Sequence, residues 1–278
     1  MNRVIFICFL LSGFTSIIFS QNDSMLLSER STSSISLRLG FNDFHIKDKY
    51  ISPYIFNGIT YTSEIAYQFK NESNRHNIQL LFSTGKINSD IQTRNATSYI
   101  GYIAYTFTHK IKSWNIAGNR FNFHIGTGLS TYFEYLTLNS EDIATNSNSY
   151  DDSWYVSHSI NLNLYGEYEL GERNILSILI TSPVIRLVTR PANGHYFNLD
   201  NTEVIENNKL KVLTGGKLEF VWNNLEFITL IEYQAPLSER FNFHTAYMFG
   251  YAASDKPADL LSANMYMNNF LVGVDWLL

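Results

Sequence analysis

Charge and cysteine are scarce in this chain of 278 residues. Charged residues make up 16% of it and the formal net charge is −5, so no basic field points to nucleic acid as a partner. The one cysteine, Cys8, lies close to the N-terminus, which excludes disulfides and cysteine-based metal or nucleophile chemistry from residues 21–278. The seven histidines are scattered, with no HxH or HExxH spacing, so we expect neither a metal site nor a cofactor.

Long apolar runs are also missing beyond the first twenty residues. Arg3 precedes the apolar stretch 4–11, which continues through residues 12–20, and the chain turns polar at Gln21. This pattern predicts a signal peptide, residues 1–20, cleaved near Ser20. No later stretch approaches the roughly 18 uninterrupted apolar residues of a membrane-spanning helix. We therefore expect an exported protein without spanning helices.

Aromatic residues and strict alternation are abundant instead. The chain has 18 Tyr and 20 Phe, yet its mean hydropathy is only −0.11. In residues 59–69, Ile59, Tyr61 and Ile65 alternate with Thr60, Thr62 and Glu64, and this period of two indicates a strand. Eleven such segments occur, near residues 33–44, 58–70, 77–88, 96–108, 120–137, 154–170, 174–190, 208–222, 225–235, 240–252 and 264–278. Their lengths suit tilted membrane strands of about 9–11 residues with extensions.

These segments predict an all-β fold, a single antiparallel transmembrane β-barrel of about 10–12 strands. Short polar connections, such as residues 171–174 and the pair Asn223 and Asn224, alternate with long ones at 138–153 and 191–207, as in outer-membrane barrels. Single-chain bacterial barrels have even strand numbers, and we favour twelve. The missing strand is either hidden in residues 45–56 or produced by a turn at residues 181–183, where the apolar face changes phase. A bulge at residues 181–183 is the alternative.

The C-terminal segment carries a resemblance. Apolar and aromatic side chains alternate up to the last residue, at Tyr266, Phe270, Val272, Val274, Trp276 and Leu278. This resembles the C-terminal strand by which bacterial outer-membrane β-barrel proteins are recognised for assembly. The resemblance implies that residues 21–278 form one barrel in the outer membrane of a Gram-negative bacterium. Its partners would be outer-membrane lipid and the barrel assembly machinery. The main alternative is a soluble secreted β-sandwich.

The pentapeptide RFNFH occurs at residues 120–124 and again at 240–244. In a strand, both Phe residues of each copy face one way, while Arg, Asn and His face the other. We interpret the motif as a strand start with interfacial aromatic residues rather than as a duplicated unit, because the similarity stops after His. A functional pair formed by His124 and His244 is the alternative.

Charged residues on the polar faces are expected to point into the lumen. The candidates are Arg38, Glu64, His124, Glu134, Glu167, Lys211, Lys217, Glu219, Glu232, Arg240 and His244. Charges removed from bulk water need partners, so a structural salt-bridge network is the first interpretation of this mixed-sign set. A lumen that binds or conducts an unidentified small solute, as in a porin-like barrel, is the alternative.

We predict a non-enzymatic barrel with a role in small-solute passage or binding, or in envelope structure and surface interaction. The competing hypothesis is a lipid-modifying hydrolase, since outer-membrane phospholipases and lipid A deacylases use a His–Ser pair on one lipid-facing strand. Here His158 lies at an apolar position, but Ser157 and Ser159 point the other way. A hydroxyl from a neighbouring strand, such as that of Thr131, would have to replace them, so we assign no catalytic residue.

Overall fold

The computed structural model describes residues 31–48, 55–90, 95–139, 152–170, 174–189, 217–221, 224–254 and 263–278. These residues form strands: β1 (Thr32–Asp48), β2 (Ile55–Lys70), β3 (Asn74–Ser89), β4 (Asn95–Ile116), β5 (Asn119–Asn139), β6 (Asp152–Leu170), β7 (Asn174–Thr189), β8 (Lys217–Phe220), β9 (Asn224–Pro236), β10 (Phe241–Ser254) and β11 (Ala263–Leu277). Within them no helix is long and apolar enough to cross a membrane. The predicted signal peptide lies outside the described residues and stays a prediction.

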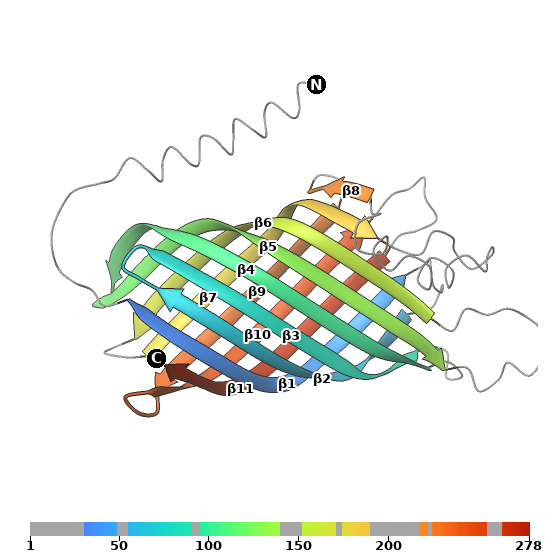
Figure 1. Cartoon of the computed structure of the whole chain (residues 1–278), viewed down its shortest axis with the longest axis horizontal. Helices are drawn as coiled ribbons and strands as arrows, with labels where there is room; N and C mark the ends of the chain where they lie inside the picture. Colours follow the sequence, from blue (N-terminus) through green and yellow to red (C-terminus); the bar gives the residue numbers. More distant parts are fainter. Residues whose placement is uncertain are drawn as a thin grey trace, which may run out of the picture. The chain divides into compact units, whose positions relative to one another are not determined.

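The sheet closes on itself as a barrel (Figure 1). Neighbours in sequence pair antiparallel, and β1 completes the ring by pairing with both β2 and β11. At this closure Arg38 lies opposite Glu64 on one side and Gly273 on the other. The all-β barrel prediction is confirmed. The β-sandwich alternative is wrong, because one closed sheet replaces two stacked ones.

Ten strands form the ring, since all eleven except β8 take part in it. The favoured count of twelve is therefore not met. We had predicted that the chain reverses at Asn223 and Asn224, but β8 and β9 both run antiparallel to β7 and thus in the same direction. β9 pairs with β7 from Ile175 to Thr181, and β8 continues along the same strand from Ile185 to Val188. The two predicted strands thus pair with the same side of β7 and take one place in the ring. The ring therefore has an even number of strands.

The phase change in residues 174–190 is a bulge. Ile160 of β6 lies opposite Ile185, and the next residue, Asn161, lies opposite Pro183, so Val184 is the extra residue. β7 continues through it as one strand, which leaves no turn there. Residues 45–48 belong to β1 and residues 55–56 to β2, while 49–54 lie outside the described residues. Of the alternatives for residues 181–183, the bulge is confirmed.

The connections differ between the two ends of the barrel. At one end, here called the turn end, short connections follow β2, β4, β6 and β9, and β1 begins beside the end of β11. At the other, the loop end, the connections are 49–54, 90–94, 140–151, 190–216 and 255–262. The long connections predicted near 138–153 and 191–207 therefore fall at the same end, and residues 140–151 and 190–216 lie outside the described part.

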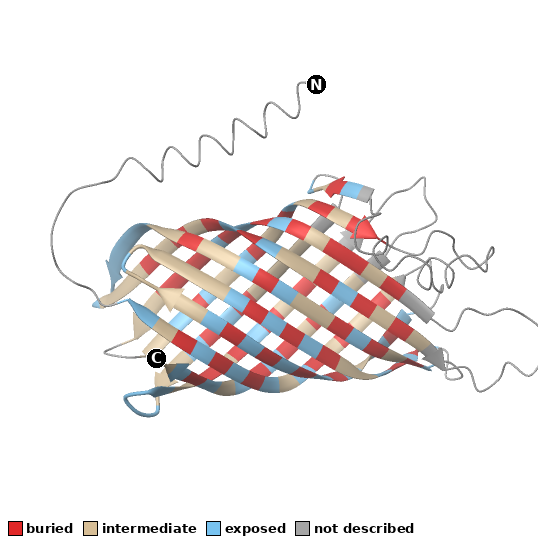
Figure 2. Ribbon diagram, viewed as in Figure 1, coloured by how far each residue is buried: buried red, intermediate tan, exposed pale blue. Residues whose placement is uncertain are grey.

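Buried and more exposed residues alternate along the strands of the wall (Figure 2). On β1, Leu37 and Leu39 are 52% and 62% exposed on the outer face, while Ser36 and Arg38 are buried inside. Nearer the loop end the pattern inverts: Phe44 and Ile46 are buried, and the residues between and beside them are polar. An apolar cluster lies in the lumen toward this end, together with buried polar residues such as Asn42, Thr60 and Ser83. It comprises Phe44, Ile46, Phe56, Leu81, Ile87, Ala96, Ile100, Tyr132, Leu136, Leu230, Ala246, Met248, Met267 and Leu271.

Candidate functional site: a charge network in the lumen

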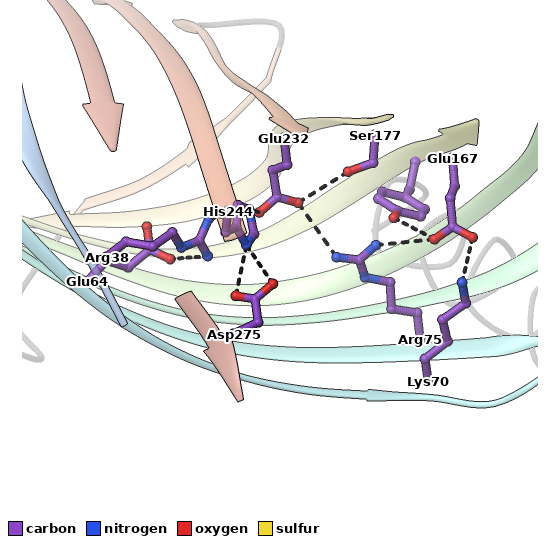
Figure 3. A network of polar contacts seen from close by, with 10 residues as sticks. Arg38, Glu64, Lys70, Arg75, Glu167, Ser177, Glu232, His244 and Asp275 are labelled. Atoms are coloured by element: carbon purple, nitrogen blue, oxygen red, sulfur yellow. Dashed lines mark hydrogen bonds and ion pairs between the residues drawn. The ribbon is translucent and has the colours of Figure 1, made fainter. Parts of the chain in front are cut away.

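The lumen on the turn-end side of the apolar cluster holds a network of buried charges (Figure 3). Arg38 on β1 forms an ion pair with Glu64 on β2, its register partner. Its other terminal nitrogen donates to Glu232 Oε1 on β9 at 2.8 Å. All three side chains are almost fully buried. Because β9 stands three places from β1 around the ring, this contact crosses the lumen.

His244 on β10 links two carboxylates. Its Nδ1 lies 2.9 Å from both oxygens of Asp275 on β11, and its Nε2 lies 3.2 Å from Glu232 Oε1. Arg38 Nη1 is also 3.2 Å from Nε2. A protonated Nε2 donates to Glu232, whereas a neutral one accepts from Arg38, so the ring keeps a partner in either state.

The network continues toward the turn end through two more cations. Lys70 contacts Glu167 at 2.5 Å, and Arg75 lies between Glu167 at 3.8 Å and Glu232 at 3.6 Å. The Arg75 guanidinium also lies 4.1 Å from the centre of the Tyr165 ring, whose hydroxyl donates to Glu167 at 3.0 Å. Glu232 additionally accepts from Ser177 at 3.3 Å. Glu232 is therefore the hub of the network.

The charges balance when His244 is protonated. Four carboxylates, those of Glu64, Glu167, Glu232 and Asp275, face the permanent cations Arg38, Lys70 and Arg75. Buried charges are tolerated only when paired in this way, because their desolvation costs several kcal/mol each, on the order of the attraction regained. A protonated His244 supplies the fourth positive charge.

Beside the network lies a cavity of about 10 Å³, lined by Arg75, Asn77, Thr106, Thr108, Tyr165, Leu179, Leu230 and Glu232. This is room for about one water molecule. The arrangement cross-links strands, because each of its carboxylates contacts a cation or His244 on another strand.

A second ion cluster lies closer to the loop end. Arg186 on β7 contacts Glu219 on β8 at 2.8 Å and forms an ion pair with Glu226 on β9. Ser182 donates to the main-chain oxygen of Glu226 at 3.1 Å. These contacts join the three strands where the ladder passes from β9 to β8. In the described part of the chain, no group of three or more His, Asp or Glu residues is placed to hold a metal ion.

The predicted lumen residues are distributed unevenly. Arg38, Glu64, Glu167, Glu232 and His244 meet in the network, whereas Glu134 and Glu219 are buried nearer the loop end. Lys211 and the side chain of Lys217 lie outside the described residues.

Two residues of the RFNFH copies depart from the expected pairing. Arg240 does not lie in the lumen: it belongs to the exposed turn 237–240, because the strand begins one residue later at Phe241. His124 is buried against Tyr165, with ring centres 5.3 Å apart, and neither of its ring nitrogens has a hydrogen-bond partner among the described residues. His124 and His244 thus do not form a pair.

Sequence reasoning missed Lys70, Arg75 and Arg186 as candidates. Lys70 and Arg75 are register partners that flank the β2–β3 turn. Continuing the alternation of each strand by one or two residues toward that turn would have placed both in the lumen. Arg186 could not be placed in the lumen by continuing the alternation of residues 174–183. The bulge at Val184 shifts that alternation by one residue, so the residues beyond it face the opposite way.

One polar pair lies on the outer face. Thr131 on β5 and His158 on β6 are register partners, and the Thr131 hydroxyl is 2.9 Å from His158 Nδ1. Both side chains are half-buried. The hydroxyl from a neighbouring strand that a hydrolase would need is thus present at hydrogen-bond distance. Among the described residues, His158 has no carboxylate partner to orient its ring.

Comparisons with known proteins give a fold-level likeness. No protein-family model and no curated protein matches the chain. The outer membrane protease OmpT of Escherichia coli is 10% identical, with 92% of this chain and 99% of that chain covered and a TM-score of 0.49. The translocator domain of the autotransporter NalP of Neisseria meningitidis is 9% identical, with 94% and 91% covered and a TM-score of 0.40. An outer membrane channel of Pseudomonas putida is 9% identical, with 92% and 99% covered and a TM-score of 0.32. The chain resembles bacterial outer-membrane β-barrels as a class.

Proposed function

We propose that this protein is an integral outer-membrane β-barrel with a closed lumen, which serves envelope structure or surface interaction without enzymatic activity. The proposal rests on one observation: in the wall of the barrel, charged side chains are buried and aliphatic side chains are exposed. Charged groups pair inside, while a belt of aliphatic side chains is exposed outside: Leu37, Leu39, Ile65, Ile78, Leu80, Ile103, Leu129, Leu162, Leu164, Ile178, Ile180, Ile231, Val272 and Val274. Soluble monomers rarely expose an apolar surface of this extent.

Aromatic side chains border this belt at both ends. Exposed rings near the turn end are Tyr67, Tyr105, Trp114, Tyr233, Phe241 and Trp276, and those toward the loop end are Phe41, Tyr61, Phe82, Tyr99, Phe133, Tyr247, Tyr266 and Phe270. Two aromatic girdles around an apolar band are the arrangement that a bilayer and its two headgroup regions favour. Beyond the second girdle, β1 turns polar outside and apolar inside at Asp43 and Phe44, which supports a wall that rises above the membrane.

The side chains inside the wall support a structural or surface role over solute passage. The charge network lies toward the turn end, and the apolar cluster and the second ion cluster lie toward the loop end. Long connections gather at the loop end, which in bacterial barrels faces outward. A closed barrel would then serve as a rigid support for these connections. Export, assembly by the barrel assembly machinery and a Gram-negative source belong to the same proposal.

Two measurements test it. The protein is expected in the outer-membrane fraction, with faster gel migration before boiling than after, and recovery as a soluble periplasmic or secreted protein would refute the membrane placement. In planar bilayers we expect no stable conductance. Open channels of reproducible size would contradict the closed lumen while leaving the membrane placement intact.

A second candidate function rests on Thr131 and His158. Their hydrogen bond of 2.9 Å on the lipid-facing side matches the distance between a nucleophile and its base. A lipid hydrolase built on it would use a hindered secondary hydroxyl and a base without an orienting carboxylate among the described residues. Mutual satisfaction of two polar groups in an apolar surface explains the contact without catalysis, and we favour that explanation.

A further inference from the structure

The hairpin between β4 and β5 projects from the turn end of the barrel. β3 begins at Asn74, opposite His109, and the Lys110 N–H donates to the Ser73 carbonyl, so residues 111–116 of β4 have β5 as their partner strand and no other among the described residues. Residues 111–118 are all exposed, and a two-residue turn of Ala117 and Gly118 closes the hairpin. It lies at the end of the barrel where the C-terminus is drawn (Figure 1). Here "projecting hairpin" denotes residues 109–124.

A bulge sets which side chains face outward on this hairpin. The register shifts between Lys110 and Lys112, so Ile111 is an extra residue and the phase of β4 reverses beyond it. As a result, Lys112 and Trp114 share the outer face with their partners, Phe123 and Phe121. The bulge therefore adds a cation and an indole ring to a face that already carries two phenyl rings.

These four side chains form one compact group. The Trp114 ring stacks on Phe121 with centres 5.7 Å apart, and its centre lies 6.4 Å from that of Phe123. The Lys112 ammonium lies 5.3 Å from the centre of the Trp114 ring. An indole with a cation beside it suits the headgroup region of a bilayer, where the ring meets the acyl boundary and the charge stays in water.

The projecting hairpin is the cationic part of an acidic chain. Residues 109–124 contain Lys110, Lys112 and Arg120 and no Asp or Glu, whereas the whole chain has a net charge of −5. None of the three cations makes an ion pair with a described residue. The adjacent connection 71–73 contains Glu72, and the connection 237–240 contains one residue of each sign, Glu239 and Arg240. The hairpin thus carries more net positive charge than either of these connections.

We propose that the projecting hairpin binds the phosphate groups of anionic phospholipids in the leaflet at the turn end. The inference rests on the proposed membrane placement and adds the lipid chemistry to it. Lys112 and Trp114 meet the headgroup at the outer surface of the barrel. Lys110 lies opposite His124 and Arg120 opposite Asn115, both on the inner face of the hairpin, and they supply further charge on it. Near an anionic surface, each such cation strengthens binding about fivefold.

A protein strand is the less suitable occupant of this hairpin. The outer edge of β4 beyond Lys110 has free main-chain groups that a strand could pair with. However, Lys110, Lys112 and a bulge on that edge are the features by which natural sheets prevent strand addition. The charge and the aromatic face favour lipid.

The test compares lipid retention by matched variants. The full-length mature barrel is reconstituted in equal amounts of phosphatidylglycerol and phosphatidylcholine, and the bound lipids are counted by native mass spectrometry. We expect the wild type to retain phosphatidylglycerol preferentially. K110Q/K112Q/R120Q should lower that preference by about a hundredfold at low salt, as the loss of three cations worth about fivefold each implies. K47Q/K86Q/R240Q removes the same charge elsewhere and should keep the preference.

Folding is checked first by heat-modifiable gel mobility, and K110R/K112R/R120K, which keeps all three charges, should restore the preference. Equal loss in the two glutamine variants, or no lipid preference in the wild type, would overturn the inference. So would a hairpin-dependent complex with an acidic soluble protein in the absence of a lipid preference. Insertion into bilayers of phosphatidylcholine alone tests the membrane placement separately, since it needs no anionic lipid.

Discussion

Glu232 and Arg38 are joined at 2.8 Å across the lumen, although 194 residues separate them in the chain. The same carboxylate meets Arg75 and His244. One acidic side chain on β9 thus ties together β1, β3 and β10. This relationship makes the barrel interior a structural element and gives Glu232 the largest expected effect of any single residue in the network.

Replacing Glu232 with Ala should destabilise the barrel by about 3–5 kcal/mol, because it leaves buried cations without their shared partner. Urea unfolding of the vesicle-inserted protein, followed by heat-modifiable mobility, measures this change. Glu239→Ala provides the control, since Glu239 is exposed in the turn 237–240. Equal midpoints for wild type and E232A would show that the network does not stabilise the fold.

His244→Phe should destabilise the barrel by a similar amount, because it removes the hydrogen-bond partner of Asp275. The Asp275 carboxylate is 1% exposed and receives both of its contacts from the His244 ring. Without the imidazole it is a buried charge without its hydrogen-bond donor, at a cost of about 3–5 kcal/mol. Adding Asp275→Asn removes that charge, so the double variant should be more stable than H244F alone. If both changes simply added up, the coupling between the two residues would be disproved.

The alternation of residues was enough to predict which face each side chain takes. Arg38, Glu64 and Glu232 were all placed in the lumen, because a period of two fixes the face of every strand residue. Which of them meet was not predictable, since contacts across the lumen depend on the number and stagger of strands in the closed ring. The sequence contains no local signal for either quantity.

Local sequence composition also failed to predict where strands start and turn, because pairing between strands decides this. The pair Asn223 and Asn224 has the composition of a turn, yet β8 and β9 follow the same partner, β7, in one direction. Arg240 was assigned to a strand that starts one residue later. Conversely, Thr131 was named from the sequence as a hydroxyl on a neighbouring strand that could reach His158, and the two side chains are 2.9 Å apart.

Thr131 and His158 should support no lipid hydrolysis. We expect purified wild-type barrel to release no more fatty acid from phospholipid or lipopolysaccharide than an empty-membrane control. Activity that is lost in both H158A and T131A, while both variants keep the heat-modifiable shift of a folded barrel, would instead establish the hydrolase. A general base within about 2.6–3.2 Å of its hydroxyl is necessary for such chemistry but does not suffice for it.

Gly40 and Gly101 should respond in opposite ways to replacement by Ala. A Cβ atom on Gly40 would meet the main chain of Phe270 and lie 2.9 Å from the Cα atom of Leu271, at the seam where β1 and β11 close the barrel. Main-chain atoms in a paired strand cannot move aside alone, so Gly40→Ala should destabilise the barrel by about 1–3 kcal/mol. A Cβ atom on Gly101 would have Phe133 Cβ, 4.0 Å away, as its nearest neighbour, so Gly101→Ala should leave the urea midpoint unchanged or slightly raised. Both variants keep the charge network and the projecting hairpin intact, so the comparison isolates the β1–β11 closure. If G40A unfolded at the same urea concentration as G101A, the close approach of the two strands at this seam would be disproved.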